Sequence, residues 1–162
     1  MICLAFDPGP KTCGFALAKL KPEMRGRPMF IGGGKVDSDH ETISICLRDH
    51  REVDIVAVET PAGYVHEHAR GAQLLETRGE ASMIAAIARV IGLLVVEMTA
   101  GEWRRQLTGK SNASDAVIAR ACAMLASGLP KRSSVHTRDA LGLAIVSLTR
   151  PKIPLQAIRE YR

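Results

Sequence analysis

Three apolar runs separated by turn-forming residues occupy the beginning of the chain. Residues 2–7 are apolar up to a closing aspartate, and comparable runs cover residues 14–20 and 29–36. Short runs of this kind, bounded by Gly and Pro, are typical of strands. The segment between the last two runs, residues 21–28, is basic and rich in turn residues, which favours an exposed loop. The pattern therefore predicts a three-stranded antiparallel meander.

Helical and strand periodicity alternate in the rest of the chain. Asp39 can cap a helix, and two short β-branched runs flank a long helical pattern. Three further helices are expected near the end, each with a Ser or Thr as its capping residue. The expected elements are a helix from Asp39, strand 54–59, helix 69–91, strand 93–98, a helix from Thr99 through Trp103, a helix from Ser114 to about Ala126, and a final helix that starts at Ser133 or Ser134 and ends before Pro151. This order predicts an α/β fold with a mixed sheet, antiparallel on one side and parallel on the other.

The length and charge of the chain indicate one basic domain. At 162 residues and 46% apolar content, the sequence suffices for a single packed core. We place this domain at residues 1–150, followed by a short basic tail over residues 151–162. The 22 Lys and Arg residues exceed the 17 Asp and Glu residues, and the resulting charge of +5 favours polyanionic partners.

The cysteine pattern and the lack of long apolar segments predict the compartment in which the protein is found. Cys3, Cys13, Cys46 and Cys122 form no CxxC pair and have mostly apolar neighbours, so we expect reduced thiols in the core. The sequence starts directly in strand pattern, without a basic leader and apolar segment. No apolar stretch approaches the roughly 20 residues of a membrane span. We therefore expect a soluble, cytoplasmic protein without membrane contact.

Two acids stand where predicted buried strands end. Asp7 closes the first run and is followed by Pro8, Gly9 and then Gly14, so its carboxylate lies at a sharp turn. Glu59 closes the strand at 54–59, close to buried surface, where an unpaired charge is unfavourable. Taken alone, Asp7 is equally consistent with an acid that closes a turn. For Glu59, the alternative is an acid that emerges into solvent at the end of the strand.

A histidine and a third acid share one predicted helix face. His136 and Asp139 are three residues apart, which separates their Cβ atoms by about 5–6 Å on a helix. Ordinary first-turn hydrogen bonds for His136 and an ion pair with a neighbouring arginine for Asp139 remain alternatives. Together with Asp7 and Glu59, the two residues form a set that suits Mg²⁺ or Mn²⁺ in phosphodiester hydrolysis by two metal ions. Asp7, on a central strand, is the expected bridging ligand.

Four motifs in a fixed order carry a resemblance to a known family. They are Asp7-Pro8-Gly9 with Gly14, Val58-Glu59, the stretch from Arg70-Gly71 through Arg78-Gly79, and His136-x-x-Asp139-Ala140-Leu141. With these motifs, roughly residues 1–148 resemble the RuvC-type Holliday-junction resolvases of the RNase H-like superfamily. The resemblance implies a five-stranded mixed sheet flanked by helices, with Asp7, Glu59, His136 and Asp139 as the catalytic metal ligands.

The same resemblance implies an activity and a partner. Its members are homodimers that cut four-way DNA junctions by paired nicks, with two Mg²⁺ or Mn²⁺ ions per active site. Family members often have aspartate where this chain has His136, although some carry histidine. A neutral imidazole lowers the negative charge of the site and softens the ligand set, which leads to the hypothesis that Mn²⁺ supports activity better than Mg²⁺.

Candidate DNA contacts lie after the last strand and after Glu59. Arg104, Arg105 and Lys110 are the expected phosphate contacts, with a merely solvated basic face as the alternative. The family suggests an aromatic wedge for the junction just beyond the second acid, and Tyr64 is the candidate here.

The sequence also leaves alternative activities open and offers a candidate dimer surface. A broader structure-selective nuclease of the same superfamily, acting on flaps or on branched or single-stranded nucleic acid, is the alternative activity. An actin-like ATPase would need a second domain and a phosphate loop, so we expect no nucleotide cofactor. A non-catalytic DNA-binding module would not need clustered acids. For the dimer we expect a surface on the long helix around Met83, Ile84, Ile87 and Ile91, with ordinary core packing as the alternative.

Overall fold

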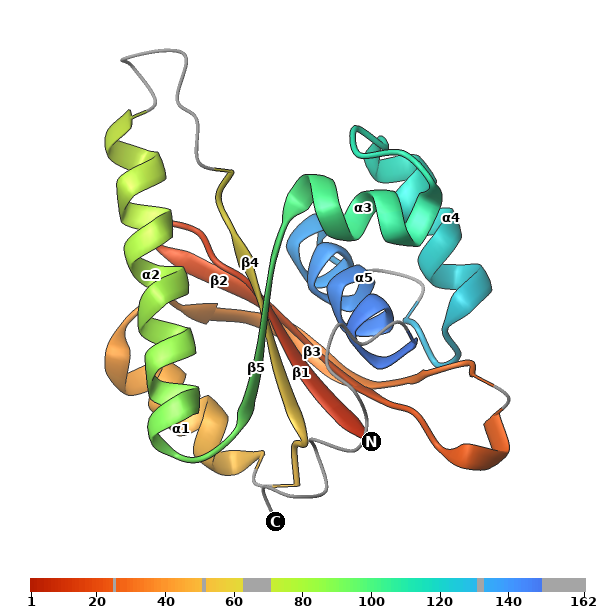
Figure 1. Cartoon of the computed structure of the whole chain (residues 1–162), viewed down its shortest axis with the longest axis horizontal. Helices are drawn as coiled ribbons and strands as arrows, with labels where there is room; N and C mark the ends of the chain where they lie inside the picture. The colour runs from red at the N-terminus through yellow and green to blue at the C-terminus, as the bar shows by residue number, and fades with distance from the viewer. Residues whose placement is uncertain (25, 51, 63–70, 131–132, 150–162) are drawn as a thin grey trace.

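A five-stranded mixed sheet forms the centre of the molecule (Figure 1). The computed structural model describes residues 1–24, 26–50, 52–62, 71–130 and 133–149. Its strands are β1 (Ile2–Asp7), β2 (Thr12–Lys19), β3 (Met29–Asp37), β4 (Ile55–Thr60) and β5 (Leu94–Thr99). Its α-helices are α1 (His40–Asp49), α2 (Gly71–Val90), α3 (Ala100–Thr108), α4 (Asp115–Leu125) and α5 (Val135–Thr149), and a short 3-10 helix, η1, covers Pro22–Met24.

The strand order confirms the predicted α/β class. The strands lie in the order β3-β2-β1-β4-β5. β1 and β3 each pair antiparallel with β2, whereas β1 with β4 and β4 with β5 are parallel. The expected meander and the two parallel strands are therefore both present, and the expected loop between β2 and β3 contains η1.

Two apolar layers cover the two faces of the sheet. Alternate side chains along β1 enter different layers, because strand side chains alternate between faces. Leu4 and Phe6 pack with α1 and α2, whereas Cys3 and Ala5 pack on the side of α3, α4 and α5 (Figure 1). The strand residues on the second side are mostly small, which allows α5 to lie close to the sheet.

Local capping fixes several helix ends. Asp39 accepts a hydrogen bond from the backbone N–H of Thr42 at 2.8 Å, as expected for the cap of α1. Thr99 and Glu102 form a reciprocal capping box at the start of α3. This helix runs beyond the predicted end at Trp103, to Thr108, and stops where Gly109 adopts a left-handed conformation with φ of 83°.

The apolar residues expected at a dimer surface on α2 differ in their exposure. Ile84 is buried, and Met83 and Ile87 pack against the layer that contains α1. Of the four residues proposed for a dimer surface, only Ile84 is fully covered, so a dimer surface on this helix stays a prediction. The more exposed apolar residues of this region are Leu75, Val90 and Ile91.

The remaining expectations concern cysteines, membrane spans and the tail. All four cysteines are buried and unbridged, as predicted. Within the described residues, no helix has the length and apolar content needed to cross a membrane. The predicted basic tail, residues 151–162, lies outside the described residues.

Candidate active site

Asp7 and Glu59 lie at the same edge of the sheet, on neighbouring strands. Asp7 is the last residue of β1, and Glu59 is the penultimate residue of β4. The two strands are parallel, and Phe6 pairs with Val58. Asp7 and Glu59 are therefore the next residues after this pair on their two strands. Both acids therefore lie at the ends of buried strands, as expected, and the structure adds that these strands are neighbours.

The first turn of α5 places His136 against Asp7. The Nδ1 atom of His136 lies 2.7 Å from Oδ2 of Asp7, within hydrogen-bond distance. The His136 side chain is 50% exposed, whereas that of Asp7 is 13% exposed. Burial raises the pKa of Asp7, and the hydrogen bond and charge of His136 oppose this increase.

The start of α5 is held by contacts to the sheet. The hydroxyl of Ser134 accepts a hydrogen bond from the backbone N–H of Thr137 at 3.0 Å, which caps the helix. The Thr137 hydroxyl donates to the carbonyl of Gly34 on β3 at 3.2 Å. Gly14 on β2 faces the backbone of His136 so closely that a Cβ atom there would lie 2.6 Å from the His136 Cβ. A glycine at this position is what permits the close approach of helix and strand.

Glu59 is held by a tryptophan of α3. The indole Nε1–H of Trp103 donates to Oε2 of Glu59 over 2.7 Å. Burial is the main reason that the pKa of Glu59 rises to about 7, and the negative charge of Asp7 adds to the increase. Near neutral pH this carboxyl group is therefore divided between its protonated and ionised forms.

Asp139 is paired with Arg104, which had been expected to contact DNA. An Nη atom of Arg104 lies 2.8 Å from Oδ2 of Asp139, and the two side chains are 25% and 9% exposed. The guanidinium carbon also lies 5.2 Å from the centre of the Trp103 ring. Burial raises the pKa of Asp139, and the charge of Arg104 opposes this increase. The pairing shields Asp139.

The predicted site residues thus lie near one another but do not converge on one point. The charges of Asp7 and Asp139 both act on Glu59, so the three acids share one electrostatic environment. In the described part of the chain, however, no three carboxylate, imidazole or thiol side chains converge closely enough to hold a single metal ion. Each ligand candidate instead has its own partner, with His136 on Asp7, Trp103 on Glu59 and Arg104 on Asp139.

Two of the other predicted DNA contacts are exposed, and the third lies outside the described residues. Arg105 on α3 and Lys110 just beyond it are exposed, as a phosphate contact requires. Tyr64, the candidate wedge, lies outside the described residues. The roles of Trp103 and Arg104 toward the acids were not anticipated from the sequence. One signal for Trp103 existed in Gly142, a glycine inside an otherwise apolar helix, which faces the Trp103 ring.

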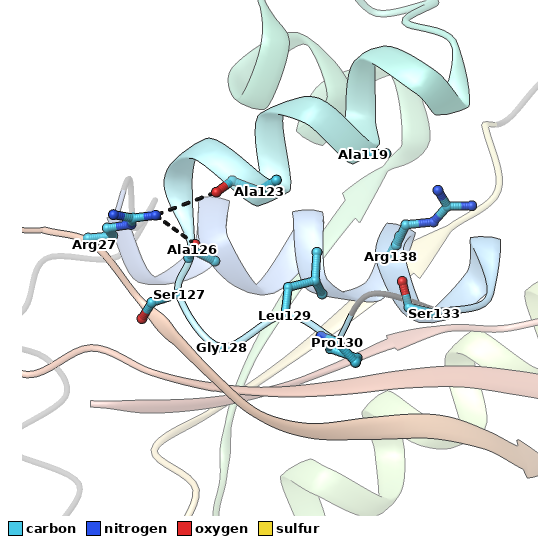
Figure 2. A pocket seen from close by; sticks show the side chains of 10 residues that line it. All are labelled: Arg27, Ala119, Ala123, Ala126, Ser127, Gly128, Leu129, Pro130, Ser133 and Arg138. Carbon is cyan, nitrogen blue, oxygen red and sulfur yellow. Dashed lines mark hydrogen bonds between the residues drawn. The ribbon is translucent and has the colours of Figure 1, made fainter.

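A separate groove lies beside the first turn of α5. Figure 2 shows it between α4, the segment that follows α4, and the start of α5, with Arg27 and Arg138 at opposite ends. Arg27 donates hydrogen bonds to the carbonyl oxygens of Ala123 and Ala126, at 3.5 and 3.2 Å. The groove is lined by none of the predicted site residues, so it is distinct from the cluster of acids.

The architecture and the position of the acids define an RNase H-like α/β fold. The chain superimposes on the structure of Thermus thermophilus RuvC in complex with a Holliday junction substrate with a TM-score of 0.74 and 18% identity, over 92% of this chain and 93% of that one. A second Thermus thermophilus RuvC structure gives a TM-score of 0.68 and 18% identity, over 90% and 92% of the two chains. The yeast mitochondrial Holliday junction resolvase Ydc2 gives 0.54 and 11% identity, over 99% of this chain and 81% of its own.

Sequence comparison adds no relative to these structural neighbours, because no family model and no curated protein matches the chain. The similarity lies in the fold, which extends over almost the whole length of both RuvC chains. The RuvC-type, RNase H-like architecture implied by the sequence motifs is therefore confirmed.

Proposed function

We propose that this chain is a divalent-metal-dependent endodeoxyribonuclease that resolves four-way DNA junctions by paired nicks. One observation carries the proposal: Asp7, Glu59 and Asp139 share one electrostatic environment at the end of the central strands, in a fold shared with RuvC over nearly its full length. Clustered buried acids on a chain with a net charge of +5 favour chemistry on a polyanion over simple binding.

The donor set fits Mg²⁺ or Mn²⁺ in its chemistry. Three carboxylates provide the oxygen ligands that these ions prefer, and His136 adds one nitrogen. Burial and like charge raise the pKa of Glu59 to about 7, and a bound cation would favour its ionised form. Asp7, Glu59, His136 and Asp139 would hold the ions once the His136–Asp7 and Arg104–Asp139 contacts give way to them. When bound, a pair of such ions stabilises charge on the attacking and leaving oxygens of a phosphodiester.

The protein's own groups have separate tasks in this proposal. Asp7 and Glu59 stand on rigid strands, so their carboxylates would hold the ions at a fixed position relative to the sheet. Arg104, once released from Asp139, is close enough to the site to pair with a DNA phosphate, and the exposed Arg105 and Lys110 bind the flanking backbone. In a two-fold homodimer, two such sites would face opposite strands of a junction, which itself has two-fold symmetry.

The test uses purified protein, a mobile four-way junction and either Mg²⁺ or Mn²⁺. We expect wild type to cut the junction symmetrically and Asp7→Asn to bind the junction without cutting it. The reason is that phosphate contacts by basic residues survive this substitution, whereas a charged ligand of the metal is removed. Cleavage by Asp7→Asn at the wild-type rate would contradict the proposed mechanism.

Flaps, bubbles and linear duplex of the same sequence serve as competing substrates. A preference of at least about tenfold for the four-way junction, equivalent to about 1.4 kcal/mol, is expected for a resolvase. Equal cleavage of all branched substrates would instead identify the broader structure-selective nuclease.

A further inference from the structure

We propose that Trp103 is a positioning residue whose indole N–H holds the Glu59 carboxylate in the orientation needed for metal binding. The inference rests on the proposed function, since it assumes that Glu59 is a metal ligand. It assigns a task to a side chain outside the predicted acids and basic contacts.

The hydrogen bond between the two side chains constrains both of them. Trp103 is completely buried, and its Nε1–H lies 2.7 Å from Oε2 of Glu59. An indole has a single polar hydrogen and no acceptor, so this contact has only one possible direction. A buried donor that loses its partner destabilises a protein by about 1–3 kcal/mol. The indole therefore favours the Glu59 rotamer that keeps Oε2 in place.

The Trp103 ring is itself fixed by its surroundings. The capping box of Thr99 and Glu102 starts α3 immediately after β5, which places Trp103 in the first turn of the helix. On α5, Gly142 leaves room for the ring, because a Cβ atom at this position would lie 2.7 Å from Cζ3 of Trp103. Arg104 lies near the ring, 5.2 Å from its centre. With α3 and α5 packed around it, the indole has little freedom to turn away from Glu59.

A neutral donor is suited to this task. The arginine that pairs with Asp139 neutralises its charge, whereas the indole orients Glu59 without supplying a positive charge. The bond occupies Oε2, and Oε1 accepts no hydrogen bond from the described residues. Glu59 is thus held by one oxygen and offers the other, with its negative charge, to a cation. Hydrogen bonds from neighbouring groups commonly orient metal ligands in this way.

The test compares Trp103→Phe with Leu107→Val. Phenylalanine keeps most of the ring and removes the N–H, whereas Leu107 is a buried residue of the same helix that also faces Gly142 and cannot donate a hydrogen bond to the acids. Binding of Mn²⁺ alone, without DNA, is measured by electron paramagnetic resonance, and junction cleavage is measured in parallel. We expect Trp103→Phe to weaken Mn²⁺ binding by about 10–100-fold. Leu107→Val should bind Mn²⁺ as wild type does.

A second measurement follows the indole directly and needs no folded Trp103 variant. Trp103 is the only tryptophan in the chain, so ¹⁵N-labelled protein gives a single indole N–H resonance. We expect this resonance to move upfield in Glu59→Ala, where its acceptor is lost, and to shift when wild type is saturated with Mg²⁺.

The outcomes separate the two proposals. Wild type that binds Mn²⁺ and cuts junctions, together with equal Mn²⁺ affinity in Trp103→Phe, would overturn the positioning role alone. An indole resonance that is insensitive to both Glu59→Ala and Mg²⁺ would overturn it as well. A wild-type protein that binds neither metal ion and cuts no DNA would refute the proposed function, and the positioning role with it.

Discussion

The contact between Gly14 and the start of α5 leads to a sharp prediction for Gly14→Ala. The added Cβ would lie 2.6 Å from the Cβ, 2.7 Å from the carbonyl carbon and 2.8 Å from the carbonyl oxygen of His136. Ordinary contacts begin at 3.4 Å, so helix and strand must separate by about 0.8 Å. None of these atoms is the end of a flexible side chain, so the start of α5 must move as a whole.

This displacement should affect both stability and activity. Overpacking of a close contact destabilises a protein by about 1–3 kcal/mol. A misplacement of about 1 Å at a reacting centre can lower the rate about 100-fold. Because His136 and Asp139 both stand on the displaced turn, we expect junction cleavage with Mg²⁺ to fall about 100-fold. Urea denaturation gives the loss in free energy of unfolding, and single-turnover cleavage gives the rate.

Gly34→Ala is the matched control. It lies on β3 of the same sheet, but the nearest atoms to its Cβ would be in the Phe15 ring, at 3.5 and 3.8 Å, which are ordinary contacts. We expect its stability to stay within about 0.5 kcal/mol of wild type. If Gly14→Ala matches this control in both stability and cleavage rate, the proposed role of the close approach is refuted.

Three other predictions concern charge at and around the site. The first is measured in EDTA. Because the pKa of Glu59 is raised, the folded protein keeps a proton that the unfolded chain loses between pH 4.5 and about 7. The free energy of unfolding should therefore fall as pH rises through this range. The Glu59 contribution is at most roughly 3 kcal/mol, and urea denaturation at several pH values should show a shallower dependence in Glu59→Gln; equal slopes would contradict the raised pKa. Cleavage should be faster in Mn²⁺ than in Mg²⁺, and His136→Asp should narrow this difference, whereas equal rates for wild type in the two metals would refute the softening role of the imidazole. Arg105→Gln and Lys110→Gln should each lower the slope of log affinity against log salt for junction binding by about one. The control Arg48→Gln, on the opposite face of the sheet, should leave this slope unchanged. An unchanged slope in the first two variants would exclude Arg105 and Lys110 as phosphate contacts.

The order of the elements was accessible from the sequence because local patterns determine it. The apolar run before Asp7 and the cap at Asp39 each involve residues that are neighbours along the chain. The end of α3 was harder to predict, since the helix continues past Trp103 to a stop that Gly109 provides. The dimer surface expected on α2 stays a prediction, because apolar residues on a helix do not reveal which of them the sheet covers.

The site followed from the sequence only as far as strand geometry allowed. Parallel neighbouring strands bring Asp7 and Glu59 to one edge, and helical spacing places His136 beside Asp139. The pairs of Trp103 with Glu59 and of Arg104 with Asp139 join residues 44 and 35 positions apart, on different elements. Such pairs depend on the packing of α3 against α5, which no local pattern describes.

The burial of α5 has a consequence for how this molecule would lose its activity. The helix is buried from Asp139 to Leu148, while its first turn carries His136. Amide protons in such a helix exchange with solvent mainly through global opening of the fold. Asp139 therefore lies in a part of the molecule that we expect to exchange slowly, and thermal inactivation should coincide with unfolding of the whole domain.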